Sequence, residues 1–300
     1  HGSVISLGLG YEHKAPTANV AFQAPEMNND FVQNLKNERI FSSELGYQFN
    51  NSWLHANLSG YYSRVDNATE WTCFYFDDIN SFSYNSLTGL NKEYYGAELG
   101  LTFKLTSFLD FKALGTISEA KNISNAKVRY LNSTQGTYVD DIALVENMRE
   151  SGTPLTAGSL GLSFHQGGWF IDLNGNYYDR IYLSYSPYYR YQTPLKNQKS
   201  VDNEGNFIVS PQDKGKGGFM LDGTIGKSIR LKKGSLSINL MVTNILNNQK
   251  IVTGGYEQSR SDYSLKNDGS TSDRCYRFSK NPKKYYIYGT NGMLQVAYRF

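Results

Sequence analysis

The feature that most constrains this chain is an alternation of apolar and polar side chains, with a period of two, in most of its extended segments. The last segment places Leu294, Val296, Tyr298 and Phe300 on one face, and Gln295, Ala297 and Arg299 on the other. Successive side chains of a β-strand point to opposite faces, so each such segment has one apolar and one polar face. A sheet of this kind survives in a bilayer by closing into a barrel, which leaves no unpaired edge.

The alternation predicts roughly ten strands. They cover about 3–11, 39–49, 54–62, 95–105, 111–117, 159–165, 169–177, 219–231, 236–243 and 294–300. Short turns at about 50–52, 106–108, 166–168 and 232–234 alternate with long connections at about 12–38, 122–153, 186–216 and 247–283. An antiparallel up-and-down meander therefore has all its long loops at one end, as outer-membrane barrels do. Greek-key sandwiches mix loop lengths at both ends.

The composition fits a barrel wall one sheet thick better than a globular protein with a large apolar core. Apolar residues make up 39% of the chain, aromatic residues 14% and charged residues 19%. A lipid-facing surface, aromatic girdles and a polar interior account for this balance. The net charge of +3 is small and dispersed, which gives no support for nucleic-acid binding. A soluble, Tyr-rich β-protein that binds glycans is the alternative with the same composition.

Neither a transmembrane helix nor a signal peptide is predicted. The chain lacks a run of about 18 apolar residues. It also lacks an initiating Met and a segment with a basic start and an apolar stretch. We therefore expect His1 to start a mature chain or a fragment of a longer one.

Charged side chains fall on the polar face of the predicted strands. They are Glu44, Glu98, Lys104, Asp172, Asp222 and Arg230. Burying bare ions in a dry interior costs several kcal/mol each, so these groups are expected to meet water or an inserted protein segment. We predict that they line the lumen and face a plug domain, with a solvated sheet face as the alternative.

One predicted outer loop is rich in aromatic residues. It carries Tyr182, Tyr185, Tyr188, Tyr189, Arg190 and Tyr191. Aromatic rings stack on sugars, peptides or aromatic chelates, and Arg190 is suited to pair with an anion. The alternative is packing of the loop itself. The acidic pairs Asp77–Asp78 and Asp140–Asp141 are candidate Ca²⁺ ligands or protease groups, and solvated loop charges are the favoured interpretation.

No catalytic, cofactor or metal motif is recognised. No pair among His1, His13, His55 and His165 has metal-ligand spacing, and Gly-x-Ser-x-Gly is absent. Residues 213–218 contain lysines and glycines without the phosphate-loop spacing. Cys73 and Cys275 both fall in predicted outer loops, and the sequence leaves open whether they pair. We expect a protein that is not an enzyme and has no cofactor.

Several stretches resemble TonB-dependent outer-membrane receptors of the Bacteroidetes type. They cover residues 34–47, 58–67, 95–101 and 242–247. The terminal Tyr298-Arg299-Phe300 looks like the signal that the barrel-assembly machinery reads, although Gln295 replaces its usual glycine. The resemblance covers most of the chain and matches the last part of such a barrel.

The resemblance implies a barrel of about 22 strands around an N-terminal plug. Residues 1–300 would then be the C-terminal portion of the barrel, without the plug. The implied function is import of a nutrient through the bacterial outer membrane. The implied partners are membrane lipid, the plug, the TonB complex and, in some assemblies, a surface lipoprotein. Ligand identity is not predicted.

A second hypothesis treats the chain as a complete ten-stranded outer-membrane barrel that acts as a protease or adhesin. It requires pairing of the strand near Ile5 with the strand near Val296. Both membrane hypotheses predict an integral protein of the outer membrane of Gram-negative bacteria.

Overall fold

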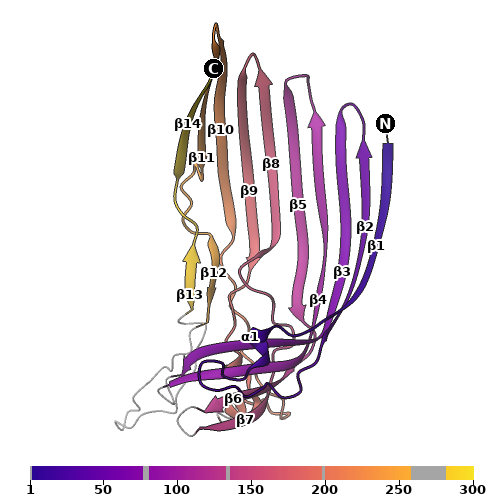
Figure 1. Cartoon of the computed structure of the whole chain (residues 1–300), viewed down its shortest axis with the longest axis vertical. Helices are drawn as coiled ribbons and strands as arrows, with labels where there is room; N and C mark the ends of the chain where they lie inside the picture. Colours follow the sequence, from indigo (N-terminus) through magenta and orange to yellow (C-terminus); the bar gives the residue numbers. More distant parts are fainter. Residues whose placement is uncertain (1, 77–80, 133–135, 198–199, 258–281) are drawn as a thin grey trace.

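A computed structural model describes residues 2–76, 81–132, 136–197, 200–257 and 282–300 (Figure 1). Ten antiparallel strands follow one another across one sheet. They are β1 (Gly2–Lys14), β2 (Glu38–Asn50), β3 (Leu54–Phe76), β4 (Ser81–Lys104), β5 (Leu109–Asn122), β8 (Pro154–Gln166), β9 (Trp169–Ile181), β10 (Gly218–Leu231), β11 (Gly234–Thr243) and β14 (Asn291–Arg299). The all-β meander predicted from the sequence is confirmed.

Further elements lie where the long connections run. β6 (Ala126–Asn132) pairs with the far part of β4 and with β7 (Thr137–Ala143). β12 (Val252–Tyr256) and β13 (Lys283–Tyr286) form a separate two-stranded sheet. The helical turns are α1 (Ala18–Ala21), η1 (Pro187–Arg190) and α2 (Gln192–Asn197). We call the described residues among 15–37, 66–91, 123–153, 182–217, 244–257 and 282–290 the loop layer.

Strand register gives the sheet two chemically different faces. Leu45 pairs with Gly60 and Tyr47 with Leu58 on the outer face. Glu44 pairs with Tyr61 and Gln48 with Asn57 on the inner face. Cross-strand partners share a face, so the alternation of each strand extends across the whole wall. No helix among the described residues is long and apolar enough to cross a membrane.

Tight turns and long connections occupy opposite ends of the wall (Figure 1). The strands β8 and β9 are joined by Gly167 and Gly168, whose φ angles are 58° and 79°. Positive φ at both central residues is the requirement of a type I′ hairpin turn, which glycine meets without strain. The equivalent connections at 51–53, 105–108 and 232–233 are also short. The predicted asymmetry of the loops is confirmed.

The buried apolar core lies in the loop layer, not within the wall. Ala68, Leu87, Leu90, Val128 and Tyr191 are at most 5% exposed and pack together. The wall is one sheet thick, and its outer apolar side chains are open, with Leu7 68% and Leu240 41% exposed. An apolar surface of this extent requires a partner other than water.

The two ends of the strand order lie apart. β1 and β14 occupy opposite edges of the sheet, and each pairs with a single neighbour in the described structure (Figure 1). The hypothesis of a complete ten-stranded barrel, which required β1 to pair with β14, is therefore wrong.

The two faces of β11 give a direct energetic test. Replacing Leu240 with Arg places a charge on the outer face, and we expect it to cost about 2–4 kcal/mol of folding free energy in a bilayer. The matched change, Asn239→Arg, places the same charge on the inner face and should cost about 0.5 kcal/mol. Urea unfolding of the full-length protein in lipid vesicles measures both. Equal costs would contradict the assignment of the faces.

Candidate functional site

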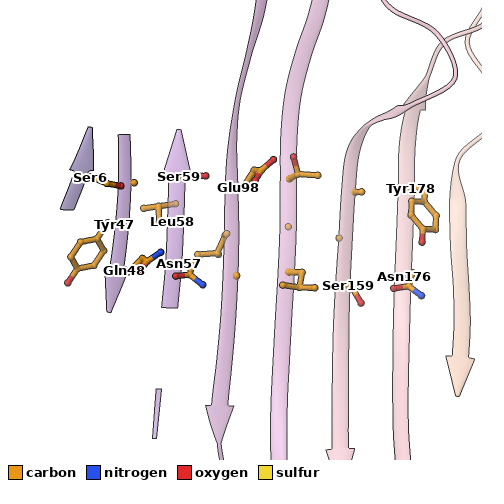
Figure 2. A pocket seen from close by; sticks show the side chains of 18 residues that line it. Ser6, Tyr47, Gln48, Asn57, Leu58, Ser59, Glu98, Ser159, Asn176 and Tyr178 are labelled. Atoms are coloured by element: carbon orange, nitrogen blue, oxygen red, sulfur yellow. The ribbon is translucent and has the colours of Figure 1, made fainter. Parts of the chain in front are cut away.

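The inner face of the wall forms an open trough lined by polar and apolar residues (Figure 2). It encloses about 520 Å³. Many of its lining residues are small or polar, among them Ser6, Asn57, Ser59, Ser159 and Asn176, and Leu114 and Tyr178 add larger side chains. Because many of these side chains are short, the sheet leaves room on this face for water or for another protein segment.

The predicted lumen residues all lie on the inner face by strand register. Asp172 accepts a hydrogen bond from Ser163 Oγ at 2.5 Å, and Asp222 accepts one from Asn176 Nδ2 at 2.8 Å. The remaining four have no ion-pair partner within the described part of the chain: Glu44, Glu98, Lys104 and Arg230. Contact with a plug domain stays a prediction for this set.

A buried ion pair holds the aromatic segment 182–191 in place. Arg190 Nη1 donates to Glu257 Oε2 at 2.7 Å, and Nη2 donates to Oε1 at 2.9 Å. Both side chains are 0% exposed. The backbone N–H of Ser186 donates to the same carboxylate at 2.9 Å. The anion that the sequence analysis expected for Arg190 is thus supplied by the chain itself.

The neighbouring tyrosines pack against the core of the loop layer. Tyr191 is fully buried, stacks on Tyr130 at 5.5 Å between ring centroids, and donates from its hydroxyl to Asn85 Oδ1 at 2.8 Å. Burial raises the pKa of Tyr191 well above its usual value. Tyr188 meets Tyr191 edge to face. These contacts match the alternative given in the sequence analysis, in which the aromatic loop packs against the protein itself.

Ligand contact by the aromatic segment 182–191 stays a prediction. The exposure of its side chains limits which of them a ligand could reach. Tyr189, Arg190 and Tyr191 are at most 4% exposed. Tyr182 lies under the guanidinium of Arg149 at 4.8 Å and keeps partial exposure. Tyr185 is also partly exposed, and its hydroxyl accepts from Asn122 Nδ2 at 3.0 Å.

An acid–lysine cluster that sequence reasoning missed lies where the wall meets the loop layer. Lys92 Nζ pairs with Glu150 Oε1 at 2.7 Å and with Glu70. The Lys92 side chain is 10% exposed, whereas Glu70 and Glu150 are 36% and 43% exposed. Strand register places Lys92 on the inner face, and Glu150 lies 58 residues away in a connection with no strand signal.

The two carboxylates of this cluster border a cavity of about 420 Å³. Trp71 and Tyr185 supply aromatic surface, and Arg149 supplies a positive charge. Hydroxyl groups come from Thr69, Thr72, Ser151 and Ser184. A site of this size, with aromatic walls and a few convergent polar groups, is typical of small-ligand binding.

The remaining predicted residues have separate locations. Cys73 is partly buried and forms no disulfide with another described residue, and burial raises the pKa of its thiol. Cys275 and the pair Asp77–Asp78 lie outside the described residues. Asp140 pairs with Arg129, and Asp141 accepts from the backbone N–H of Thr193.

The terminal aromatic residues lie at the end of the sheet with the tight turns. Tyr298 is on the outer face of β14, and its hydroxyl donates to the backbone carbonyl of Lys233. Phe300 follows the strand, fully exposed, with its ring 6.1 Å from that of Tyr298. A role for the two residues in assembly stays a prediction.

Removing one partner of the buried pair should loosen the loop layer. In Arg190→Met the carboxylate of Glu257 stays buried without a counter-charge, which typically costs about 3–5 kcal/mol. Hydrogen exchange of the amides in 183–191 should rise sharply in the full-length protein. The double variant Arg190→Met with Glu257→Met should recover most of the protection, because it leaves no unpaired charge.

Lys196→Met, an exposed change in the same layer, serves as the control and should leave exchange unchanged. Unchanged exchange in Arg190→Met would contradict a structural role for the pair.

A family model described as the β-barrel of TonB-dependent receptor-like proteins matches residues 5–245. No curated protein shows significant similarity to the chain.

Solved structures share the fold at low identity. The copper transporter OprC matches at 15% identity and a TM-score of 0.59, covering 98% of this chain and 36% of its own. The siderophore receptor PiuA from Acinetobacter baumannii matches at 13% identity and a TM-score of 0.57. The match covers 98% of this chain and 33% of PiuA. The FrpB iron transporter from Neisseria meningitidis matches at 15% identity and a TM-score of 0.55. The match covers 98% of this chain and 36% of FrpB. The chain spans about a third of the length of these proteins.

The family match settles the class of protein. Members are receptors and transporters rather than enzymes, and they reside in the outer membrane of Gram-negative bacteria. The soluble glycan-binding alternative is therefore wrong, whereas a specific relation to Bacteroidetes members stays a prediction. With an inner face that is polar, an outer face that is apolar and a matching model over most of its length, this chain belongs to the TonB-dependent receptor family.

Proposed function

We propose that residues 1–300 are the C-terminal portion of the barrel of a TonB-dependent receptor that binds a nutrient at the cell surface and imports it through a plugged lumen. The low share of each solved relative that the chain covers supports this reading. Unpaired strand edges do not persist in hydrocarbon, so β1 and β14 require further strands of the same barrel.

The observation that carries the proposal is the charged inner face. Glu44, Glu98, Lys104 and Arg230 project from one wall without a partner in the described structure. An ion taken out of water without a partner costs several kcal/mol, so these groups require a wide wet lumen or a polar domain within it. A plug domain that fills the barrel meets both needs.

The loop layer supplies the surface for ligand capture. The cavity beside Glu70 and Glu150 is lined by residues of the loop layer, which we place on the route from the cell surface to the lumen. Trp71 and Tyr185 offer aromatic surface next to groups of both charges. We infer that the ligand is an organic molecule with polar substituents. Contact with the TonB complex through the plug, and with a surface lipoprotein, are further proposals.

Import should depend on this protein and on energy from TonB. In a strain that lacks the full-length gene, one or more nutrients of a defined medium should persist in the spent medium, as measured by mass spectrometry. Restoring the gene should restore their depletion, because the receptor is the route of entry. Deleting TonB or adding a proton uncoupler should abolish depletion again.

The control is a gene-restored strain carrying Lys232→Gln in the tight turn, which should deplete the medium as the wild type does. Depletion that is the same with and without the gene, or that continues without TonB, would contradict the proposal.

A further inference from the structure

A further cavity of the loop layer lies between the hairpin of β6 and β7 and the connection from β1 to β2. It encloses about 360 Å³. The hairpin contributes Arg129 and Tyr138, and the connection contributes Gln23 and four residues within 29–33. A volume of this size accommodates a small molecule. We call it the hairpin cavity.

The hairpin cavity is lined by a buried carboxamide whose oxygen has no partner. Gln23 is 1% exposed. Its Nε2 donates to the backbone carbonyls of Arg129 at 2.8 Å and of Tyr84 at 3.5 Å, which fixes the orientation of the amide. Oε1 is the atom left over, and it has no hydrogen-bond partner among the described residues. A buried acceptor without a donor is costly, so a ligand that donates to it is favoured.

The residue bonded to this carboxamide adds a donor. Nε of Arg129 is buried and makes no hydrogen bond with another described residue. It lies 3.6 Å from Asp140 Oδ1, and the guanidinium lies over the ring of Tyr138 at 5.0 Å. One acceptor and one donor therefore come from two residues that contact each other. Hydroxyl groups both donate and accept, so a ligand with several of them can bond to both.

The rim of the cavity is exposed and consists mainly of planar polar groups. Asn29 and Gln33 carry carboxamides, and Asp30 carries a carboxylate. Phe31 is 70% exposed and is the one purely apolar side chain among the described lining residues. A lining of this kind offers many hydrogen bonds and a single apolar surface. It suits a polyhydroxylated ring, whose hydroxyl groups lie around its edge and whose C–H groups form an apolar face, better than an aromatic chelate.

The charges of the cavity favour a neutral ligand. Its lining holds one acid, Asp30, and one base, Arg129. Asp30 Oδ2 accepts from the hydroxyl of Tyr138 at 2.6 Å, and Asp140 faces Arg129 from the same hairpin. An anion would be repelled by the two carboxylates, whereas a neutral hydroxyl can donate to an acid and accept from the guanidinium.

The hairpin cavity is separate from the cavity beside Glu70 and Glu150. Arg129 pairs with Ser86 of β4, and their side chains lie on one face of the extension that β4 forms with β6. The neighbouring Leu87 and Val128 lie on the other face, buried in the core of the loop layer. Leu87 lines the cavity beside Glu70 and Glu150, and the two cavities have no lining residue in common.

We propose that the hairpin cavity binds one ring of a neutral saccharide. One hydroxyl of the ring donates to Gln23 Oε1 and another accepts from Arg129 Nε. The carboxamides of Asn29 and Gln33 bond to hydroxyls at the rim, and the C–H face of the ring lies on Phe31. The site does not rest on the import proposal, and it would persist in a receptor whose transport is blocked.

The first test compares small probes on the unmodified full-length receptor. The receptor is kept in a detergent without a sugar headgroup and titrated by saturation-transfer NMR with the methyl glycosides of glucose, galactose, mannose and N-acetylglucosamine. At least one should bind saturably. Tetrahydropyran-2-methanol, which keeps the ring but lacks the ring hydroxyls, should not bind. The methyl glycoside of glucuronic acid should bind about fivefold more weakly than its neutral counterpart, because it brings a carboxylate towards Asp30.

The second test uses variants at the rim and at the buried guanidinium. Phe31→Ala with Gln33→Ala removes a stacking surface and a carboxamide at exposed positions, and should weaken binding about tenfold. Arg129→Lys keeps the charge beside Asp140 but removes Nε–H, and should weaken binding about fivefold. Tyr288→Ala with Asn203→Ala is the matched control, because it removes an exposed ring and an exposed carboxamide elsewhere in the loop layer. It should leave binding unchanged.

Four results would overturn the proposal. They are no binding of any neutral glycoside, equal binding of the ring without hydroxyls, glucuronide binding as tight as that of the neutral sugar, and equal loss in the control variant. The first three need no variant, so they do not depend on how a variant folds. Failure of nutrient depletion in the import experiment would leave all four measurements unaffected.

Discussion

Backbone hydrogen bonding in an apolar medium is the constraint on which this structure depends. Hydrocarbon offers no partner for an N–H or C=O group, so every strand that crosses it must be paired on both sides. The antiparallel meander from β1 to β14 provides this pairing within the sheet. Once the backbone is paired, each side chain has only two directions available. The period-two alternation then assigns one direction to lipid and the other to the lumen, as Leu240 and Asn239 illustrate.

The loop layer is stabilised by different interactions from those of the wall. Its residues bury a conventional core around Leu87, Leu90 and Tyr191. It also contains an ion pair without solvent contact, between Arg190 and Glu257. Such a pair contributes little net stability but makes other arrangements costly, because either partner alone would be a buried bare charge. The segment from 183 to 191 is thereby fixed against residue 257, and the cavity beside Glu150 gains a defined wall.

The sequence was informative wherever structure follows from local pattern. Alternation located all ten strands of the wall, and Gly167–Gly168 located a hairpin turn, because both signals lie within a few neighbouring residues. The loop layer was not predicted. The hairpin of β6 and β7 fell in a stretch assigned to a connection. The sequence offered Arg190 a ligand anion or packing of the loop as alternatives, because its partner, Glu257, lies 67 residues away and no local pattern links them.

Accessibility along β10 tests the central claim most directly. Single cysteines at positions 219–225, in a full-length receptor with Cys73 and Cys275 replaced by serine, would carry a spin label in native outer membrane. The account predicts that labels at 219, 221, 223 and 225 collide with oxygen dissolved in lipid. Labels at 220, 222 and 224 should instead collide with a water-soluble nickel chelate. Accessibility without a period of two, or with the two reagents exchanged, would contradict the assignment of the outer face to the bilayer.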